Sequence, residues 1–420
     1  MKKSLTIVAA GLLAAAVQQG PARADGVPEF KVDPFWPKPL PSNWMLGQVS
    51  GIAVDKDDRI WIVHRPGTLV DDEKGALANP PTTKCCTPAP PVMQFDAQGN
   101  LLKRWGGRGA GYDWPESEHG IHVDSQGNVW LAGNSPKDQQ ILVFDQDGKF
   151  LRQLGKPGSP AGSDAAGGLG RPAHMVVEGD ELYVADGYAN RRVVVFDART
   201  LAYKRHWGAY GEKPHDDKLP PYDPRAALAR SFGNPVHCVR VARDGLVYVC
   251  DRANDRIQIF DKSGKFVKEH RIEPETLQNG SVWDLVLSED RAQRYIFVAD
   301  GANNQMLVVD RASGAVLSRF SRPGRMAGEL KWVHNMGIDS KGNLYTAEVG
   351  TGRRAQKFAR VQKLEEKRPR AAKREAGSGR RRSYARQPVL ARTSAMPLLS
   401  SSMLDSAASE MPVCIATALR

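Results

Sequence analysis

The sequence predicts an all-β fold, a six-bladed β-propeller, and three observations favour this fold class. The 40 Gly and 28 Pro, beside only 7% aromatic residues, indicate many short elements joined by turns. A strand that usually ends in Phe-Asp recurs in steps of 49, 52, 64, 49 and 49 residues, closing at Phe95, Phe144, Phe196, Phe260, Val309 and Phe358. One small sheet cannot bury both of its faces, so six such units are expected to close into a ring.

Each unit begins with two apolar strands around a turn that contains Gly. The first two units show both strands, at 51–55 with 60–63 and at 120–124 with 129–131, and later second strands are expected at 182–186, 247–251 and 296–300. Segments 186–193 and 251–257 resemble the NHL repeat. The last unit has no clear fourth strand. Residues 29–33 are therefore predicted to complete it, because closing the ring removes two sheet edges.

The first 24 residues are predicted to be a signal peptide. Lys2 and Lys3 precede an apolar run from Leu5 to Val17, and a small-residue site follows at 22–24. The apolar run is too short to span a bilayer. The sequence therefore predicts export to a periplasmic or secreted location, and no membrane span.

The net charge of +12 lies mostly outside the predicted propeller, which covers residues 25–362. Residues 363–420 carry 12 Lys and Arg against 5 Asp and Glu, in a low-complexity sequence without strand alternation. This segment is predicted to be a disordered basic tail. A basic arm for nucleic acid or anionic lipid is the alternative interpretation of the tail. Because the propeller itself is nearly neutral, it is not expected to bind nucleic acid.

Aligning the six units reveals a candidate metal site. The residues just before the Gly-Ile-Ala-Val-Asp position are Ser50, His119, Ala173, His237, Trp283 and His334. The three histidines belong to units two, four and six, about 120° apart in a six-fold ring, so their imidazoles can converge on its axis. Three neutral imidazoles with an open fourth position are typical of catalytic zinc. In the alternative interpretation, each histidine caps a strand or bonds a loop carbonyl.

Three further candidates are expected on the same face of the ring as the histidines. The start of the first strand and the end of the second strand of each unit share one face, because the strands are antiparallel. Arg65, Tyr188 and Arg252 follow second strands, and a Pro-rich insertion at 66–91 follows Arg65. Arg65 is a candidate for a bidentate carboxylate contact and Tyr188 for proton transfer. The aspartates that recur in the repeat, Asp186, Asp251 and Asp300, are expected to be structural turn acceptors.

Residues 47–65, with 186–188, 251–252 and the three histidines, resemble peptidyl-α-hydroxyglycine α-amidating lyase, and the similarity covers most of residues 45–360. The resemblance implies that His119, His237 and His334 bind zinc and that Tyr188 is the general base. It also implies that Arg65 holds and polarises substrate and that Arg252 is a second arginine of the active site.

The resemblance further implies a structural calcium ion, bound partly by the backbone carbonyls of Ile52 and Ile121. Three positions depart from the family. Asn335 replaces an aspartate that ligates the calcium, Trp332 replaces the methionine of the substrate pocket, and Ala189 replaces a disulfide cysteine. An amide oxygen can coordinate calcium, but it brings no charge.

The leading functional hypothesis is a zinc-dependent lyase that cleaves the C–N bond of an N-(α-hydroxyalkyl) amide, with a small-molecule or peptide α-hydroxyglycine as substrate. The protein is expected to act as a monomer. The alternative is a non-catalytic NHL-repeat propeller that binds protein or cell-envelope ligands on its upper face. A sugar-lactone hydrolase would instead need a Ca²⁺ site rich in carboxylates on the axis. The pairing of Cys85, Cys86, Cys238 and Cys250 stays open.

Overall fold

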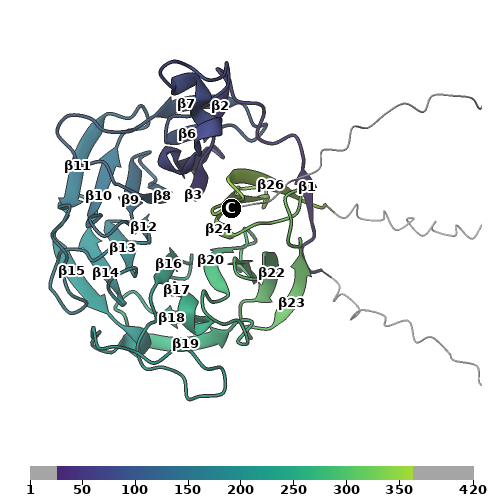
Figure 1. The fold of residues 1–420 in the computed structure, drawn as a ribbon. Helices are drawn as coiled ribbons and strands as arrows, with labels where there is room; N and C mark the ends of the chain where they lie inside the picture. The colour runs from purple at the N-terminus through teal and green to yellow at the C-terminus, as the bar shows by residue number, and fades with distance from the viewer. Residues whose placement is uncertain (1–25, 363–420) are drawn as a thin grey trace, which may run out of the picture. The chain divides into compact units, whose positions relative to one another are not determined.

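The computed structural model describes residues 26–362, which form a ring of six four-stranded antiparallel sheets (Figure 1). Blade one contains β3 (Gln48–Val54), β4 (Ile60–Arg65), β6 (Val92–Phe95) and β7 (Leu101–Trp105). Blade two contains β8 (Glu118–Val123), β9 (Val129–Gly133), β10 (Gln140–Phe144) and β11 (Phe150–Gly155). Blade three contains β12 (His174–Glu178), β13 (Glu181–Asp186), β14 (Arg192–Asp197) and β15 (Tyr203–Trp207). The predicted six-bladed propeller is confirmed.

The remaining blades repeat this order. Blade four contains β16 (Val236–Val241), β17 (Val247–Asp251), β18 (Arg256–Phe260) and β19 (Phe266–Arg271). Blade five contains β20 (Val282–Leu287), β21 (Tyr295–Asp300), β22 (Gln305–Asp310) and β23 (Val316–Phe320). Blade six contains β24 (Val333–Ile338), β25 (Leu344–Glu348), β26 (Arg354–Arg360) and β1 (Phe30–Asp33). The innermost strands surround the axis of the ring (Figure 1).

The first strand of the chain closes the ring, as the sequence predicted. β1 pairs antiparallel with β26, with Phe30 opposite Arg360 and Val32 opposite Phe358. Trp36 then packs against Phe95 of blade one. The predicted signal peptide at 1–24 and tail at 363–420 lie outside the described residues. Within the described residues, no helix is long and apolar enough to cross a membrane.

The core of the ring lies between the blades. Six clusters of buried apolar side chains are found in the described residues, and each joins two neighbouring blades. Trp61 and Val63 of blade one, for example, share a cluster with Ile121 and Leu131 of blade two. Since each sheet is covered on both faces only by its neighbours, removing one blade would expose two of these clusters.

A second set of aspartates follows the innermost strands and stabilises the turns of the repeat. Asp55 accepts hydrogen bonds from the backbone N–H of Asp57 and of Arg59, both at 3.0 Å, and from the Trp61 indole at 2.9 Å. Asp124 binds the Trp130 indole at the same distance in blade two. One carboxylate therefore closes the turn between two strands and fixes the ring of the buried tryptophan on the second strand.

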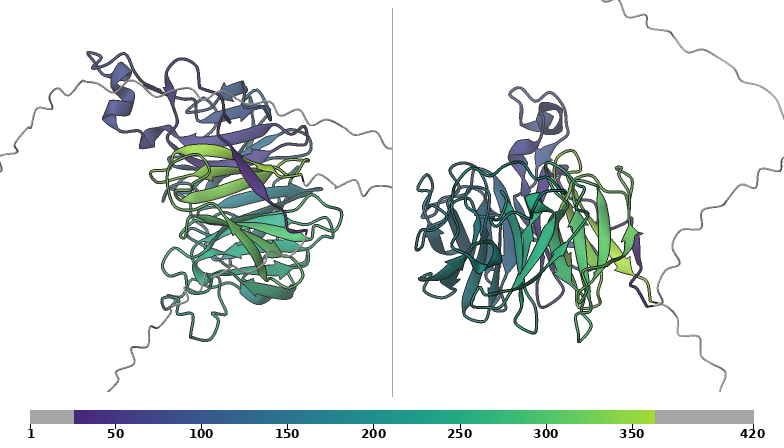
Figure 2. Two further views of the ribbon diagram at one scale, coloured as in Figure 1. Left: turned by 90° about the vertical axis from the view of Figure 1, so that its right-hand side faces the viewer. Right: turned by 90° about the horizontal axis from the view of Figure 1, so that it is seen from below.

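Short elements outside the blades build up one face. The Pro-rich insertion contains two 3₁₀ helices, η1 (Pro66–Thr68) and η2 (Asp71–Leu77), and β5 (Thr87–Pro88), which pairs with β2 (Trp44–Met45). It projects from one face of the ring in both side views (Figure 2). An ion pair between Glu73 and Arg353 ties it to blade six. Two further 3₁₀ helices are η3 (Ala209–Gly211) and η4 (Arg252–Asn254).

Candidate functional site

Three buried imidazoles meet at the centre of the ring. His119 on β8, His237 on β16 and His334 on β24 are each 2–3% exposed. Each offers one ring nitrogen, and these three atoms all lie within 4.8 Å of one another. The structure therefore brings together the histidines that the alignment of the units singled out.

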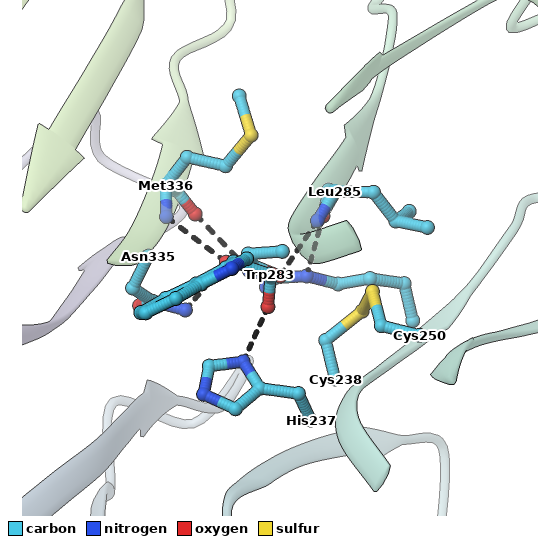
Figure 3. Close-up of a disulfide and its surroundings, with 9 residues drawn as sticks. His237, Cys238, Cys250, Trp283, Leu285, Asn335 and Met336 are labelled. Carbon is cyan, nitrogen blue, oxygen red and sulfur yellow. Dashed lines mark hydrogen bonds and ion pairs between the residues drawn. A yellow bond between two sulfur atoms is a disulfide. The ribbon is translucent and has the colours of Figure 1, made fainter. Parts of the chain in front are cut away.

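The blades between them orient the three rings. Each Nδ1 donates to the backbone carbonyl at the same register position in the next blade: His119 to Ala173 at 2.7 Å, His334 to Ser50 at 2.7 Å, and His237 to Trp283, the last drawn in Figure 3. A carbonyl can only accept, so Nδ1 carries the proton and Nε2 keeps its lone pair. The alternative interpretation, bonding to a carbonyl, is thus compatible with metal binding, because Nδ1 makes the carbonyl bond and Nε2 keeps the lone pair that a metal needs.

Electrostatics keep the three imidazoles neutral. Burial lowers the pKa of His334 to about 3, and the nearby cations Arg65 and Arg252 add to this effect. Burial, together with the other histidines and the arginines, also holds the pKa values of His119 and His237 well below the ordinary value. Three neutral imidazoles that each keep a lone pair on Nε2 are a donor set that fits a tetrahedral zinc ion with one open position.

Tyr188 lies beside these nitrogens. Its hydroxyl is 2.9 Å from Nε2 of His119 and 3.1 Å from Nε2 of His237. The guanidinium of Arg171 is 5.7 Å from the centre of its ring and that of Arg252 is 6.0 Å away. The phenol oxygen therefore lies next to two of the three nitrogens, in a partly buried site beside two arginines.

The short sequence around Tyr188 explains its position. A Cβ atom on Gly187 would lie 2.0 Å from the carbonyl oxygen of Val236, so only glycine lets this loop pack against the start of β16. Asp186 is fully buried, accepts the Gly170 N–H at 2.8 Å and pairs with Arg192 at 3.0 Å. Asp186 is thus a structural acceptor, as the sequence predicted.

Arg65 ends β4 and reaches toward blade two. Its Nε donates to the carbonyl of Glu118 at 2.7 Å, and its two terminal nitrogens donate to Gln48 at 2.9 Å and to Asn134 at 3.2 Å. Burial lowers the pKa of Arg65, yet an arginine stays protonated in proteins. Three of the five N–H donors are used, which leaves one on each terminal nitrogen for a ligand.

Arg252 has fewer hydrogen-bond partners and lies against a tryptophan ring. Its guanidinium lies 4.4 Å from the ring centre of Trp283, and its buried Nε has no hydrogen-bond partner among the described residues. Trp332 packs against Trp283 with ring centres 5.1 Å apart. The sequence had marked Trp332 for the substrate pocket but had missed the wall that it forms with Trp283, as well as Arg171. Trp283 could have been found from the sequence, because it holds the same aligned position in blade five as the histidines hold in blades two, four and six.

Asn335, which was expected to bind calcium through its side chain, is instead bonded within the protein. The side-chain oxygen of Asn335 accepts the N–H of Ile52 at 2.8 Å, and its amide nitrogen donates to Asp284. The only side-chain oxygen expected in this calcium site is thus engaged, whereas calcium requires six to eight free oxygen ligands.

Two disulfides settle the cysteine pairing that the sequence left open. Cys238, the residue after His237, is bonded to Cys250 across β16 and β17, with the Cα atoms 4.8 Å apart (Figure 3). Cys85 is bonded to its neighbour Cys86 in the insertion. The first disulfide joins the histidine strand of blade four to the strand that leads to Arg252.

Fold and site together define a six-bladed propeller with three histidines converging on its axis. No protein-family model matches the chain. Among curated proteins it is similar to NHL repeat-containing protein 3 of Mus musculus, at 24% identity over 77% of this chain and 82% of that protein. It is also similar to peptidyl-alpha-hydroxyglycine alpha-amidating lyase 2 of Drosophila melanogaster, at 24% identity over 79% of this chain and 75% of that protein.

Among solved structures, an inactive virginiamycin B lyase from Staphylococcus aureus with quinupristin is 15% identical. That match covers 80% of this chain and 86% of the lyase chain, with a TM-score of 0.45. The curated relatives, named for NHL repeats and for amidating lyases, agree with the propeller family that the sequence indicated.

Proposed function

We propose that the protein is a zinc-dependent lyase that cleaves the C–N bond of an N-(α-hydroxyalkyl) amide such as a peptidyl-α-hydroxyglycine. One observation carries this proposal. The Tyr188 hydroxyl lies 2.9 Å and 3.1 Å from two of the three imidazole nitrogens that converge at the axis. A proton acceptor and a nitrogen donor set for a Lewis acid therefore face the same point. The names of the lyase relatives support the same class of reaction.

The chemistry of the substrate assigns a task to each group. Zinc bound by the three histidines supplies a Lewis acid that makes a substrate hydroxyl more acidic. Tyr188 is assigned to accept that proton, and the guanidinium groups of Arg171 and Arg252 lie 5.7 Å and 6.0 Å from the centre of its ring. The carbon–oxygen bond becomes a carbonyl while the C–N bond breaks with its electron pair on nitrogen. Tyr188 returns the proton to that nitrogen, which gives an amide and glyoxylate.

Two arginines are available for the carboxylate of an α-hydroxyglycine. Arg252 has an unpartnered buried Nε, and Arg65 keeps one N–H on each terminal nitrogen. Charge-assisted hydrogen bonds to a carboxylate are about twice as strong as neutral ones and fix its orientation. Beside them, Trp283 packs against the Arg252 guanidinium and Trp332 packs against Trp283.

The test is an assay for glyoxylate release from an N-acyl-α-hydroxyglycine by protein loaded with one zinc per chain. We expect equal amounts of amide and glyoxylate, loss of turnover after removal of the metal with a chelator, and recovery when zinc is added back. A zinc-loaded protein that releases no glyoxylate contradicts the proposal and favours the alternative, a binding propeller. Export, predicted from residues 1–24, would place this reaction in the periplasm or outside the cell.

A further inference from the structure

A second group of side chains fills the centre of the ring next to the histidines. Arg240 lies on β16, three residues after His237, and reaches across to blades five and six. Its Nε donates to the carbonyl of Leu285 at 2.9 Å, and one terminal nitrogen donates to the Asp284 carboxylate at 2.8 Å and to the carbonyl of Met336 at 3.0 Å. Asp284 is completely buried and the Arg240 side chain is 18% exposed.

The carbonyls that Arg240 binds belong to one register position of the ring. Leu285 and Met336 stand two residues after the aligned position in blades five and six, and Ile52 and Ile121 hold the same place in blades one and two. The last two are the residues to which the family resemblance assigns calcium through their carbonyls. Arg240 thus donates to the ring of carbonyls in which a structural cation is expected.

Asn335 completes this group and links three blades. Its amide nitrogen donates to Asp284, which also accepts the Met336 N–H at 2.9 Å, and its oxygen accepts the Ile52 N–H at 2.8 Å. Figure 3 shows Leu285, Asn335 and Met336 meeting beside the histidine strand. We call Arg240, Asp284 and Asn335 the arginine layer, and His119, His237 and His334 the histidine layer.

We infer that the Arg240 guanidinium is the resident cation of this layer, so that the fold needs no calcium ion at this position. The charges agree with this inference, because one guanidinium faces one carboxylate, Asp284, and Asn335 brings no second negative charge. A divalent ion placed here would meet a fixed positive charge and an amide oxygen that is already bonded. The inference is independent of the proposed lyase reaction.

Calcium dependence of the wild-type protein is the first test. Protein stripped with a chelator is reloaded with zinc alone or with zinc plus millimolar calcium, and its melting temperature (Tm) and metal content are measured. We expect no bound calcium and Tm values that agree within about 1 °C. One calcium retained per chain, or a rise of about 5 °C or more on adding calcium, would overturn the inference.

Substitution of the arginine is the second test. Arg240→Met leaves Asp284 buried without its cation and is expected to lower Tm by about 5 °C or more. The matched control is Arg243→Met on the same side of blade four, where the side chain is 49% exposed and pairs with Glu289. This control should lower Tm by about 2 °C or less. Equal losses in both variants would contradict the role given to Arg240.

A double variant converts the layer back to a metal site. Arg240→Met with Asn335→Asp leaves two carboxylates and no side-chain cation among the same carbonyls. We expect calcium to raise the Tm of this variant by about 5 °C or more while leaving the wild type unchanged. The absence of any calcium response would mean that the guanidinium does not occupy a cation position, and the inference would fall. If the double variant does not fold, the calcium test on the wild-type protein still decides.

Discussion

The histidine layer and the arginine layer are neighbours on the inner strands and share β16 and β24, yet they complete the centre of the ring in different ways. In the histidine layer, backbone carbonyls accept from one nitrogen of each ring, as Ser50 does from His334, and the lone pair of the other nitrogen stays available to a metal. In the arginine layer, the side-chain oxygen of Asn335 is bonded and Arg240 brings its own positive charge. Whether a buried layer binds an ion therefore depends on which donor atoms remain free, and residue type alone does not decide it.

The largest expected effect is a loss of zinc affinity when one residue of the histidine layer is replaced. His237→Ala removes one of three nitrogen donors, so zinc affinity should fall by at least about 100-fold. Metal analysis after dialysis measures this loss. The matched control is His206→Ala on β15, which leaves the three nitrogens in place and should keep its zinc. Stoichiometric zinc in the His237 variant would show that the layer is not a metal site. Arg240→Met should keep zinc and lose stability, which would separate the two layers.

The next effect separates a zinc enzyme from a protein that only binds zinc. Tyr188→Phe removes the hydroxyl near the histidines and keeps the ring, so zinc content and Tm should stay close to wild type. Loss of a general base should lower the rate of glyoxylate release by about 10²–10⁴-fold. A variant that matches the wild-type rate would exclude Tyr188 as the base and leave the metal proposal standing.

A smaller effect is expected at the rim of the site. Arg65→Lys keeps the charge but loses the planar arrangement that bonds Gln48 and Asn134, so the carboxylate of the substrate is held less well. We expect KM to rise by about tenfold with a smaller loss of kcat. Steady-state kinetics measure the split, with Arg59→Lys in the same blade as the control. An unchanged KM would remove Arg65 from substrate binding.

The smallest expected effect concerns Asp255, which lies outside both layers. It tests whether this carboxylate, and not a group of the two layers, governs the pH dependence of stability. Burial raises the pKa of Asp255 from 3.8 to about 7. Between these pH values the folded protein holds a proton that the unfolded chain has released, so the free energy of unfolding falls as pH rises. Asp255→Asn removes this titration and keeps an acceptor for the Ser281 N–H, which is 2.7 Å away.

Thermal unfolding at several pH values measures this effect. Between about pH 4 and pH 7 the wild-type Tm should fall by about 3 °C or more relative to that of Asp255→Asn. Parallel curves for the two proteins would mean that other groups, including those of the two layers, govern the pH dependence.

The sequence predicted the ring and the backbone positions of the site well, because both follow from spacing. The strand ends at Phe95, Phe144 and Phe260 fall where the repeat placed them, and β1 completes blade six. Alignment of the units also selected the three histidines that meet on the axis. Residues at equal register in a closed ring must lie at equal depth, so spacing alone predicted that the three histidines converge.

The spacing of residues could not predict which groups the ends of long side chains contact. The position of Arg240 on its strand does not reveal whether the side chain crosses to Asp284 or extends to solvent. For the same reason the contact of Arg252 with Trp283 was missed, and Asn335 was expected to bind calcium. These contacts depend on side-chain conformations that three or four blades determine together.

The pairing of β1 with β26 sets the order in which the chain can fold. Phe30 can pair only after Arg360 is in place, and these two residues lie near opposite ends of the described sequence, so this contact has almost the longest sequence separation available to the described residues. Contacts between distant residues form slowly, and until this one forms blade six exposes an open strand edge. A chain that stops before Arg354 can never cover that edge. Incomplete or slowly released chains are therefore the form of this protein most prone to edge-to-edge aggregation.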